Sequence, residues 1–496
     1  MIFSAKELDI PKILILISSY TKTKSARDYI LNMTPSTDLI EIETSLRQTE
    51  DINNHLLRVG QLPLIEDFDI FEILKLLPRG FILSGSDIMQ IRLFLTMEKS
   101  VLEAFLYAKK LNITYNIIHE QISLITNHQS LLKMIDSIFD ERGIIYDNAS
   151  PGLSKIRRNI SLKQKELDDK MRSFLDKYKD YLAENIITTR NNRYCIPVNI
   201  TYKNKIKGTV LDISKTGQTV YIEPEVAFNI QSELEYLAVL ENEEIQKILS
   251  ILTNEIASSY DNLMKNLDIF LLLDVLHAKA MYARDIDGVM PRVNKEGKIN
   301  IIKGRHPLIK KEQVVPIDVI LNNEFKTMII TGPNTGGKTV ALKTTGIFSV
   351  MTQMGILVSC DPQSDIAIFD NIFADIGDEQ SIEQSLSTFS SHLKKIKNIM
   401  DNAKSNDLVL IDEIGSGTDP QEGSSLAIAI LNHLRKKNLR LMVTTHYSDL
   451  KIYALENDGI MSASVAFDEK TLSPLYYLVL GSSGTSNAFL IAKEWE

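Results

Sequence analysis

Hydrophobic positions recur at helical spacing through the first part of the chain. In residues 1–150, apolar side chains three or four positions apart predict consecutive amphipathic helices, for example over 25–32, 39–57 and 87–111. Short turns containing Pro and Gly, such as the one at 77–80, separate these helices. We expect the helices to form the first part of a helical core, to which residues 266–297 return.

Two longer apolar stripes lie within residues 151–265. They follow steps of three, four and seven residues and are flanked by charged side chains, which predicts an antiparallel coiled-coil arm. The first stripe contains Leu153, Ile156, Ile160, Leu167, Met171, Phe174 and Tyr178. The second contains Ile230, Leu234, Leu237, Ile245, Ile248 and Leu252.

The segment at about 187–224, between the two stripes, has a different composition. Its β-branched and aromatic residues, interrupted by turn signals, predict a small β module at the tip of the arm. From 190 to 215 cations are frequent, and Asp212 is the one acid among them. A polyanion contact and a lysine-rich solvated surface both fit this composition. The candidate nucleic-acid contacts are Arg190, Arg193, Lys203, Lys205 and Lys207.

After about residue 298, short apolar runs alternate with helical patterns, as in a sheet with crossover helices. One run, Met328 to Thr331, leads into Gly332-Pro-Asn-Thr-Gly-Gly-Lys-Thr339 and then into a helical pattern over 340–354. This order of strand, G-x-x-x-x-G-K-T and helix is typical of a P-loop that binds ATP and Mg²⁺. The predicted nucleotide-binding residues are Gly332, Pro333, Asn334, Thr335, Gly336, Gly337, Lys338 and Thr339.

A second apolar run, 408–411, ends in two acids. We expect Asp412, together with the Thr339 hydroxyl, to hold Mg²⁺, and Glu413 to activate the attacking water. His446 follows a further strand at 439–443 and is positioned to sense the γ-phosphate. A histidine bonded to the backbone at a strand end is the alternative. Ser387 and Thr388 precede a helical run at 390–400 and fit an N-cap.

The bulk composition restricts the function class. The 496 residues carry a formal net charge of −9, so any polyanion binding depends on a local basic patch. No apolar run approaches the roughly 18 residues that span a bilayer, and the N-terminus lacks an apolar signal core, which predicts a cytoplasmic protein without membrane contact. The two cysteines, Cys195 and Cys360, have neither disulfide-framework nor zinc spacing and are interpreted as small hydrophobic residues.

Taken together, these motifs resemble the ATPase of the MutS family, and more narrowly its bacterial MutS-two branch. The resemblance rests on the P-loop, on the segments beginning at Ser387, Asp412 and Thr444, and on Arg305-His-Pro307. Two arm-tip segments, 190–198 and 217–224, match as well. The resemblance covers essentially the whole chain. It implies an α plus α/β multidomain fold, with a helical core, a coiled-coil arm and a β clamp tip, followed by an ABC-type P-loop ATPase over 298–496.

The resemblance also implies roles for the matching residues. Ser387 and Thr388 would act in trans on the γ-phosphate across a homodimer formed by the ATPase domain, and His446 would be the switch histidine. The clamp tip would grip nucleic-acid backbone, either in branched DNA, restraining recombination, or in collided ribosomes that the protein would split. Two alternatives remain open: a soluble ABC-type scaffold ATPase that does not act on nucleic acid, and a nucleotide-gated scaffold without hydrolysis.

Two departures from the family pattern modify these expectations. The mismatch-reading branch has an N-terminal domain with a Phe-x-Glu wedge, and here the helical core begins within the first few dozen residues, so we expect shape or backbone recognition rather than base reading. Relatives in this branch continue into a dimerisation region and a C-terminal Smr nuclease domain. This chain stops at Glu496 and is expected to be truncated before them, so nuclease activity is not assigned to it.

Overall fold

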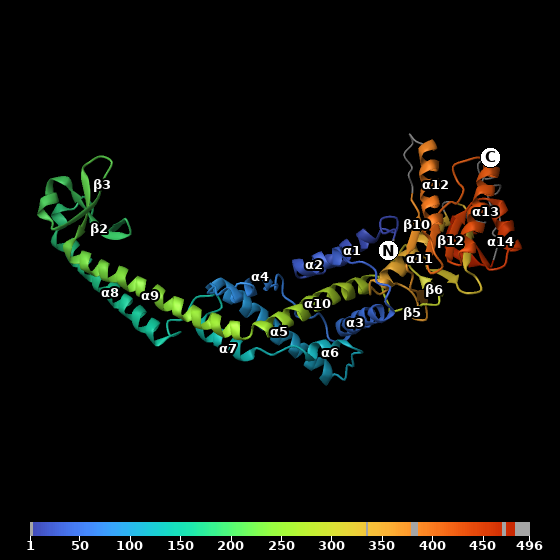
Figure 1. Ribbon diagram of the computed structural model, residues 1–496. Helices are drawn as coiled ribbons and strands as arrows, with labels where there is room; N and C mark the ends of the chain where they lie inside the picture. Colours follow the sequence, from blue (N-terminus) through green and yellow to red (C-terminus); the bar gives the residue numbers. More distant parts are fainter. Residues whose placement is uncertain (1–2, 334–335, 378–384, 469–472, 482–496) are drawn as a thin grey trace. The chain divides into compact units, whose positions relative to one another are not determined.

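The computed structural model describes residues 3–333, 336–377, 385–468 and 473–481. Its contacts divide the chain into two compact units (Figure 1). Unit 1 comprises residues 1–69, 100–125 and 265–496, and unit 2 comprises 70–99 and 126–264. Within the described residues, no helix combines the length and apolarity needed to cross a membrane.

The two units do not follow the predicted domain boundaries. Residues 70–99 and 126–150 group with the arm rather than with the other N-terminal helices. One reason is a bond within unit 2, where the Leu83 N–H donates to the Thr253 hydroxyl over 3.0 Å. The helical periodicity therefore predicted helices, but periodicity does not specify which distant helix each one packs against. Helix α5 (Gly85–Lys110) contributes residues to both units.

Unit 2 contains the two long helices predicted for the arm, α8 (Pro151–Lys177) and α9 (Glu225–Ser258). They lie side by side and antiparallel, because Arg157 pairs with Glu241 at 2.7 Å and Lys163 pairs with Glu233, also at 2.7 Å. Their coiled-coil character stays a prediction. The shorter helices of this unit are α4 (Phe71–Leu74), η1 (Leu77–Arg79), α7 (Gln129–Ile138) and η2 (Lys179–Tyr181).

A small antiparallel sheet joins α8 to α9, at the end of this helix pair (Figure 1). Its strand order is β1-β2-β4-β3. Alternating apolar residues of the central strands pack against Leu167 and Met171 of α8, which closes a separate small core. The elements are β1 (Thr188–Arg190), β2 (Arg193–Asn199), η3 (Ile200–Lys205), β3 (Gly208–Ile213) and β4 (Thr219–Pro224).

Unit 1 combines helices with two sheets. The helices outside the sheet domain are α1 (Ile10–Ser18), α2 (Lys24–Leu31), α3 (Leu39–Arg58), α6 (Ile118–Ser123) and, from residue 265 onward, α10 (Tyr260–Asp285). The smaller sheet has the order β5-β9-β6-β7 and consists of β5 (Arg292–Asn294), β9 (Asp365–Ala367), β6 (Ile299–Gly304) and β7 (Ile317–Leu321). Cys360 of unit 1 and Cys195 of unit 2 are both free and buried.

The larger sheet has six strands in the order β10-β11-β12-β8-β13-β14, and all its pairings are parallel except that between β13 and β14. Its strands are β10 (Ile372–Asp375), β11 (Leu408–Ile411), β12 (Arg440–Thr445), β8 (Thr327–Thr331), β13 (Ile460–Asp468) and β14 (Ser473–Leu480). Helix α11 (Lys338–Gln353) covers one face. Helices α12 (Ser385–Asn402), α13 (Pro420–Lys436) and α14 (Ser448–Glu456) cover the other.

Continuous apolar runs form the central strands because both faces of the sheet are covered. Along β8, Met328 and Ile330 join the core beneath α11, and Ile329 joins the core on the opposite face. The same alternation occurs in β11 and β12. Since the strands are parallel, the loops that follow β8, β12 and β11 all emerge at one edge of the sheet.

Candidate nucleotide-binding site

The loop between β8 and α11 has a backbone suited to the phosphate-binding role predicted for it. Gly332 has φ 133° and Gly337 has φ 90°, values that favour glycine. Lys338 is 1% exposed, and its ammonium donates to the Gly332 carbonyl over 2.6 Å. Burial lowers the pKa of Lys338, and nearby Glu413 and Asp412 oppose that shift. Asn334 and Thr335 lie outside the described residues.

The end of β11 brings Asp412 to the start of α11. The Thr339 hydroxyl donates to Asp412 Oδ2 over 2.6 Å, so two oxygen atoms that sequence reasoning assigned to Mg²⁺ are neighbours. Mg²⁺ is held by few protein oxygens together with water and substrate phosphates, and ligands about 2.0–2.1 Å from the ion fit such a pair. The residues present therefore suit this cofactor.

Thr444 of β12 orients both acids, a role that sequence reasoning did not assign to it. Its hydroxyl donates to Asp412 Oδ1 and accepts from the Glu413 backbone N–H over 2.8 Å. Glu413 itself has φ 47°, an uncommon left-handed conformation for a non-glycine residue. Such strained residues cluster at functional sites. The sequence did contain a signal, since Thr444 and Thr445 put two hydroxyls at the end of an apolar buried strand.

His446 directly follows β12, at the same edge of the sheet as Glu413. Its ring stacks at a tilt against that of Tyr447, with 4.3 Å between centroids. Desolvation lowers the pKa of His446, Glu413 raises it, and Lys338 lowers it further, so these charged groups are close enough to influence one another. This placement is compatible with the predicted sensing role, which stays a prediction.

The predicted N-cap at Ser387 and Thr388 is wrong. Helix α12 begins at Ser385, so both residues lie within its first turn rather than before it. The physical reason is that the apolar spacing extends upstream of residue 390, through Leu386 and Phe389. The side chains of Ser387 and Thr388 lie outside the described part of the molecule, and their action in trans stays a prediction.

Asp375, at the end of β10, links α12 to the sheet beside the acids. Its backbone carbonyl accepts from the Asp412 N–H over 2.9 Å. Its buried carboxylate contacts His392 Nδ1 at 3.0 Å and Lys395 Nζ at 3.8 Å, both on α12. The sequence alone did not reveal this connection, because it depends on the pairing of β10 with β11.

An aromatic ring from β14 lies against the P-loop. In the strand order, β14 is on the other side of β8 from β11 and β12, at whose ends Asp412, Glu413 and Thr444 lie. Tyr476 of β14 is 50% exposed, and its ring lies 3.4 Å from where a Cβ on Gly337 would be. Its φ of 63° is an outlier for an aromatic residue. Between Val465 and Phe467 of β13 the register with β14 shifts, and Tyr476 is in the bulged stretch. A bulge can re-aim a side chain, and here it directs Tyr476 toward the loop.

The predicted nucleic-acid residues of the tip fall into two groups. Arg193 binds within the module: Nε contacts Glu223 Oε1 at 2.9 Å, and Nη1 contacts Glu235 Oε1 at 3.3 Å. Glu223 is 1% exposed. Arg190 contacts Asp212 at 3.3 Å and lies over the ring of Tyr221. Both arginines therefore hold the sheet together, a pairing that counting charges along the sequence missed.

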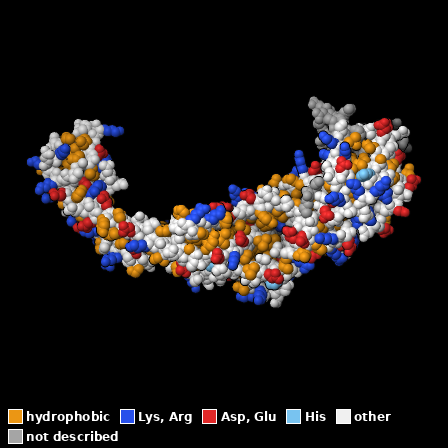
Figure 2. Space-filling model, viewed as in Figure 1, with side chains coloured by type: hydrophobic (Ala, Val, Ile, Leu, Met, Phe, Trp, Pro, Cys, Tyr) orange, Lys and Arg blue, Asp and Glu red, His pale blue; other side chains and the backbone are white. Residues whose placement is uncertain are grey.

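The lysines of the tip are free of such contacts. Lys203, Lys205 and Lys207 are exposed on η3 and the turn after it, and their side chains form no hydrogen bond or ion pair with the described residues. Tyr202, between them, is 39% exposed. In Figure 2, Lys and Arg side chains are frequent over this β module. The three lysines fit a backbone contact to a polyanion better than the two arginines do.

Replacing Arg193 with alanine is expected to destabilise the β module by about 3–5 kcal/mol, because Glu223 would keep a buried charge to which, among the described residues, the Gln231 amide still donates over 2.6 Å. Hydrogen exchange of peptides covering 188–224 measures this as lost protection. The exposed Lys203→Ala change is the matched control and should stay within about 0.5 kcal/mol. Equal protection in the Arg193 variant and the parent would contradict the assignment.

Comparisons with known proteins agree with this site. The profile of MutS domain V matches residues 328–493, a stretch that includes the P-loop, both acids and His446. "Endonuclease MutS2" of Clostridium botulinum (strain ATCC 19397 / Type A) is 41% identical over 490 residues, covering 99% of this chain and 62% of the relative. "Endonuclease MutS2" of Clostridium perfringens (strain SM101 / Type A) is 41% identical over 489 residues, with 98% and 62% covered.

The similarity extends along almost all of this chain, well beyond the matched ATPase region, and includes the arm and its β module. The chain spans about 62% of the length of these curated relatives. The resemblance that the motifs indicated is therefore confirmed, and the chain belongs to the MutS family as a member of the MutS2 type.

Proposed function

We propose that this protein is an ATP-hydrolysing clamp that binds nucleic-acid backbone, with branched DNA as its target. The observation that carries the proposal is the cluster of Thr339, Asp412, Thr444 and Glu413 at the carboxyl ends of three adjacent parallel strands. The names of the relatives add support, because an endonuclease acts on nucleic acid.

In this proposal each residue of the cluster has a separate task. The loop from Gly332 and the ammonium of Lys338 bind the phosphates, and Asp412 with the Thr339 hydroxyl would hold Mg²⁺. The ion, when bound, neutralises charge that develops on the phosphoryl oxygens. Glu413 accepts the proton of the attacking water. Thr444 fixes the orientation of the Asp412 carboxylate and holds the backbone N–H of Glu413, so this part of the site needs little reorganisation during the reaction.

Within unit 1, helix α11 connects the P-loop to helices α10 and α3. Helix α11 starts at Lys338, and at its far end the Met354 carbonyl accepts from the buried Lys279 ammonium of α10 over 2.9 Å. Thr49 of α3 donates to the Gly355 carbonyl over 3.0 Å. Because α10 follows α9 directly in the chain, movement of α11 on ATP binding would bias the helix that leads into the arm.

Two measurements test the proposal. Turnover per subunit should rise with protein concentration if the sites are composite, and a flat, near-zero rate would favour a scaffold without hydrolysis. Filter binding should show tighter association with four-way DNA than with linear duplex of equal length. Binding to ribosomes but not to DNA would indicate that the target is ribosomal RNA. Absence of binding to either would favour a scaffold that does not act on nucleic acid.

Tyr476 is expected to stack on the adenine of ATP. Tyr476→Ala should weaken ATP binding by about tenfold, since stacking of a base on an aromatic ring contributes about 1–3 kcal/mol. Titration with a fluorescent ATP analogue measures the change. Tyr476→Phe keeps the ring and should bind normally, as should the control Tyr477→Ala, which removes a neighbouring exposed ring of β14. Unchanged affinity in Tyr476→Ala would remove the stacking role.

A further inference from the structure

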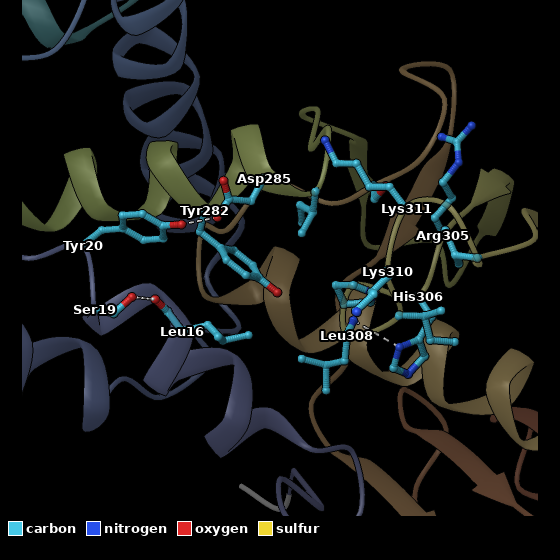
Figure 3. Close-up of a pocket in the computed structure, with 15 residues that line it drawn as sticks. Leu16, Ser19, Tyr20, Tyr282, Asp285, Arg305, His306, Leu308, Lys310 and Lys311 are labelled. Atoms are coloured by element: carbon cyan, nitrogen blue, oxygen red, sulfur yellow. Dashed lines mark hydrogen bonds between the residues drawn. The ribbon is translucent and has the colours of Figure 1, made fainter.

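A pocket separate from the P-loop lies within unit 1, beside the Arg305-His306-Pro307 segment that the proposed function does not use. It has a volume of about 290 Å³ and lies between α1, the end of α10 and the loop after β6 (Figure 3). Ligand pockets commonly measure about 300–1,000 Å³, so this one suits a small molecule. Its polar groups and charges indicate which kind of molecule.

The hydroxyl of Tyr282 lacks a partner at this pocket. Tyr282 is 3% exposed, and its hydroxyl has no hydrogen-bond partner among the described residues. Figure 3 shows this hydroxyl directed into the pocket, toward the segment that carries Leu308 and Lys310. Burial raises the pKa of Tyr282, so the hydroxyl keeps its proton and is a hydrogen-bond donor. A buried donor without an acceptor costs about 1–3 kcal/mol, which a ligand oxygen would relieve.

Several other polar groups at the pocket already have hydrogen-bond or ion-pair partners within the protein. The Tyr20 hydroxyl donates a hydrogen bond to the Asp285 carboxylate, and Lys311 pairs with Asp287 at 2.8 Å. His306 is neutral, because burial lowers its pKa to about 4, and its Nδ1 accepts from the Leu308 N–H over 3.3 Å.

Two cations of the pocket remain without a carboxylate partner. The side chains of Arg305 and Lys310 form no ion pair with the described residues. Among the residues that line the pocket, Arg305, Lys310 and Lys311 are cations and Asp285, which keeps its charge while accepting from the neutral Tyr20 phenol, is the one carboxylate. Lys311 pairs with Asp287 outside this lining, so the remaining positive charge exceeds the negative charge, which favours an anion.

Apolar side chains make up much of the remaining wall. Leu16, Ile286, Leu308 and Val314 line the pocket, and Leu16 is 44% exposed. A bare inorganic ion would leave this apolar surface in contact with water. A ligand with an apolar body would cover it, at about 25 cal/mol per Å² of area removed from water.

We propose that this pocket binds a small organic oxyanion, a carboxylate or a phosphate monoester with an apolar body. Its charged oxygens accept from the Tyr282 hydroxyl and face the side of the pocket that carries Lys310 and Arg305, and its apolar body packs against Leu16 and Leu308. The site does not depend on the ATP-driven clamp. It lies on the loop after β6, whereas the P-loop follows β8.

Fluorine NMR of small probes tests the proposal on the whole chain, with Mg²⁺ and a non-hydrolysable ATP analogue present to occupy the P-loop. The probes are 4-fluorobenzoate, 4-fluorophenyl phosphate and the neutral 4-fluorobenzyl alcohol. At least one anion should bind, the alcohol should bind at least about tenfold more weakly, and Tyr282→Phe should weaken anion binding by about fivefold. Comparing the two anions shows whether a carboxylate or a phosphate is preferred.

Matched variants keep the result interpretable. Tyr282→Phe retains the ring and its packing, so the fold is preserved while the donor is removed. Lys310→Met should weaken binding of each anion that the parent protein binds, and Lys295→Met, at an exposed lysine outside the pocket, should leave that binding unchanged. The proposal is overturned if neither anion binds, if the alcohol binds as well as the anions, or if Tyr282→Phe binds them unchanged.

Discussion

ATP turnover should fall at least about a hundredfold in Glu413→Gln, because the amide cannot accept a proton from the attacking water. ATP binding should persist, since the P-loop and the Thr339–Asp412 pair are unchanged by this substitution. The Glu413 backbone N–H would still donate to Thr444, so the strained conformation at φ 47° should be retained. Single-turnover hydrolysis, measured alongside equilibrium ATP binding, separates the two effects.

An exposed acid outside the candidate site provides the control for this experiment. Glu456→Gln, at the exposed end of α14, makes the same chemical change away from the P-loop and should leave turnover within about twofold. Normal hydrolysis in Glu413→Gln would remove the general-base role. Loss of ATP binding together with turnover would instead indicate that Glu413 shapes the nucleotide pocket.

The arrangement of the candidate nucleotide site was predictable to the extent that it is encoded in contiguous segments. The P-loop, Asp412 and Glu413 each follow a buried strand directly, so local patterns were enough to predict that they lie at one edge of the sheet. Thr444 and Tyr476 depend on the pairing of strands that local patterns do not specify: β11 with β12 for Thr444, and β8 with β13 and β13 with β14 for Tyr476. Strand order is a property of the folded sheet, and local periodicity does not contain it.

In the arm, likewise, the helices could be predicted from the sequence but the ion pairs could not. The two apolar stripes predicted helices that the structure places over 151–177 and 225–258, because helical periodicity is a local property. Arg193 was grouped with the lysines because the nearest acids in sequence are distant. In the folded module Glu223 comes from β4 and Glu235 from α9, and both reach its guanidinium. Counting charges along the sequence therefore misses the pairing of a cation with acids that the fold brings to it from another strand or helix.

Replacing Lys203, Lys205 and Lys207 together with glutamate should weaken binding to four-way DNA by at least about tenfold at physiological salt. It should also reduce the slope of log K against log salt by about 3, since each phosphate contact contributes about 0.9. The three side chains are exposed and form no bond to the described residues, so the fold of the module should be unaffected. Filter binding over a salt series measures both quantities.

In the matched control, three exposed lysines of unit 1 are replaced with glutamate: Lys110, Lys295 and Lys404. This variant has the same change in net charge. If general repulsion between an acidic protein and DNA caused the loss, both triple variants would weaken equally and the slopes would stay parallel. If the tip makes the contact, only the first variant loses slope, because counterions are released at the phosphates that its lysines neutralise. Undiminished affinity and slope in that variant would place the nucleic-acid contact elsewhere and leave the β module without its proposed role.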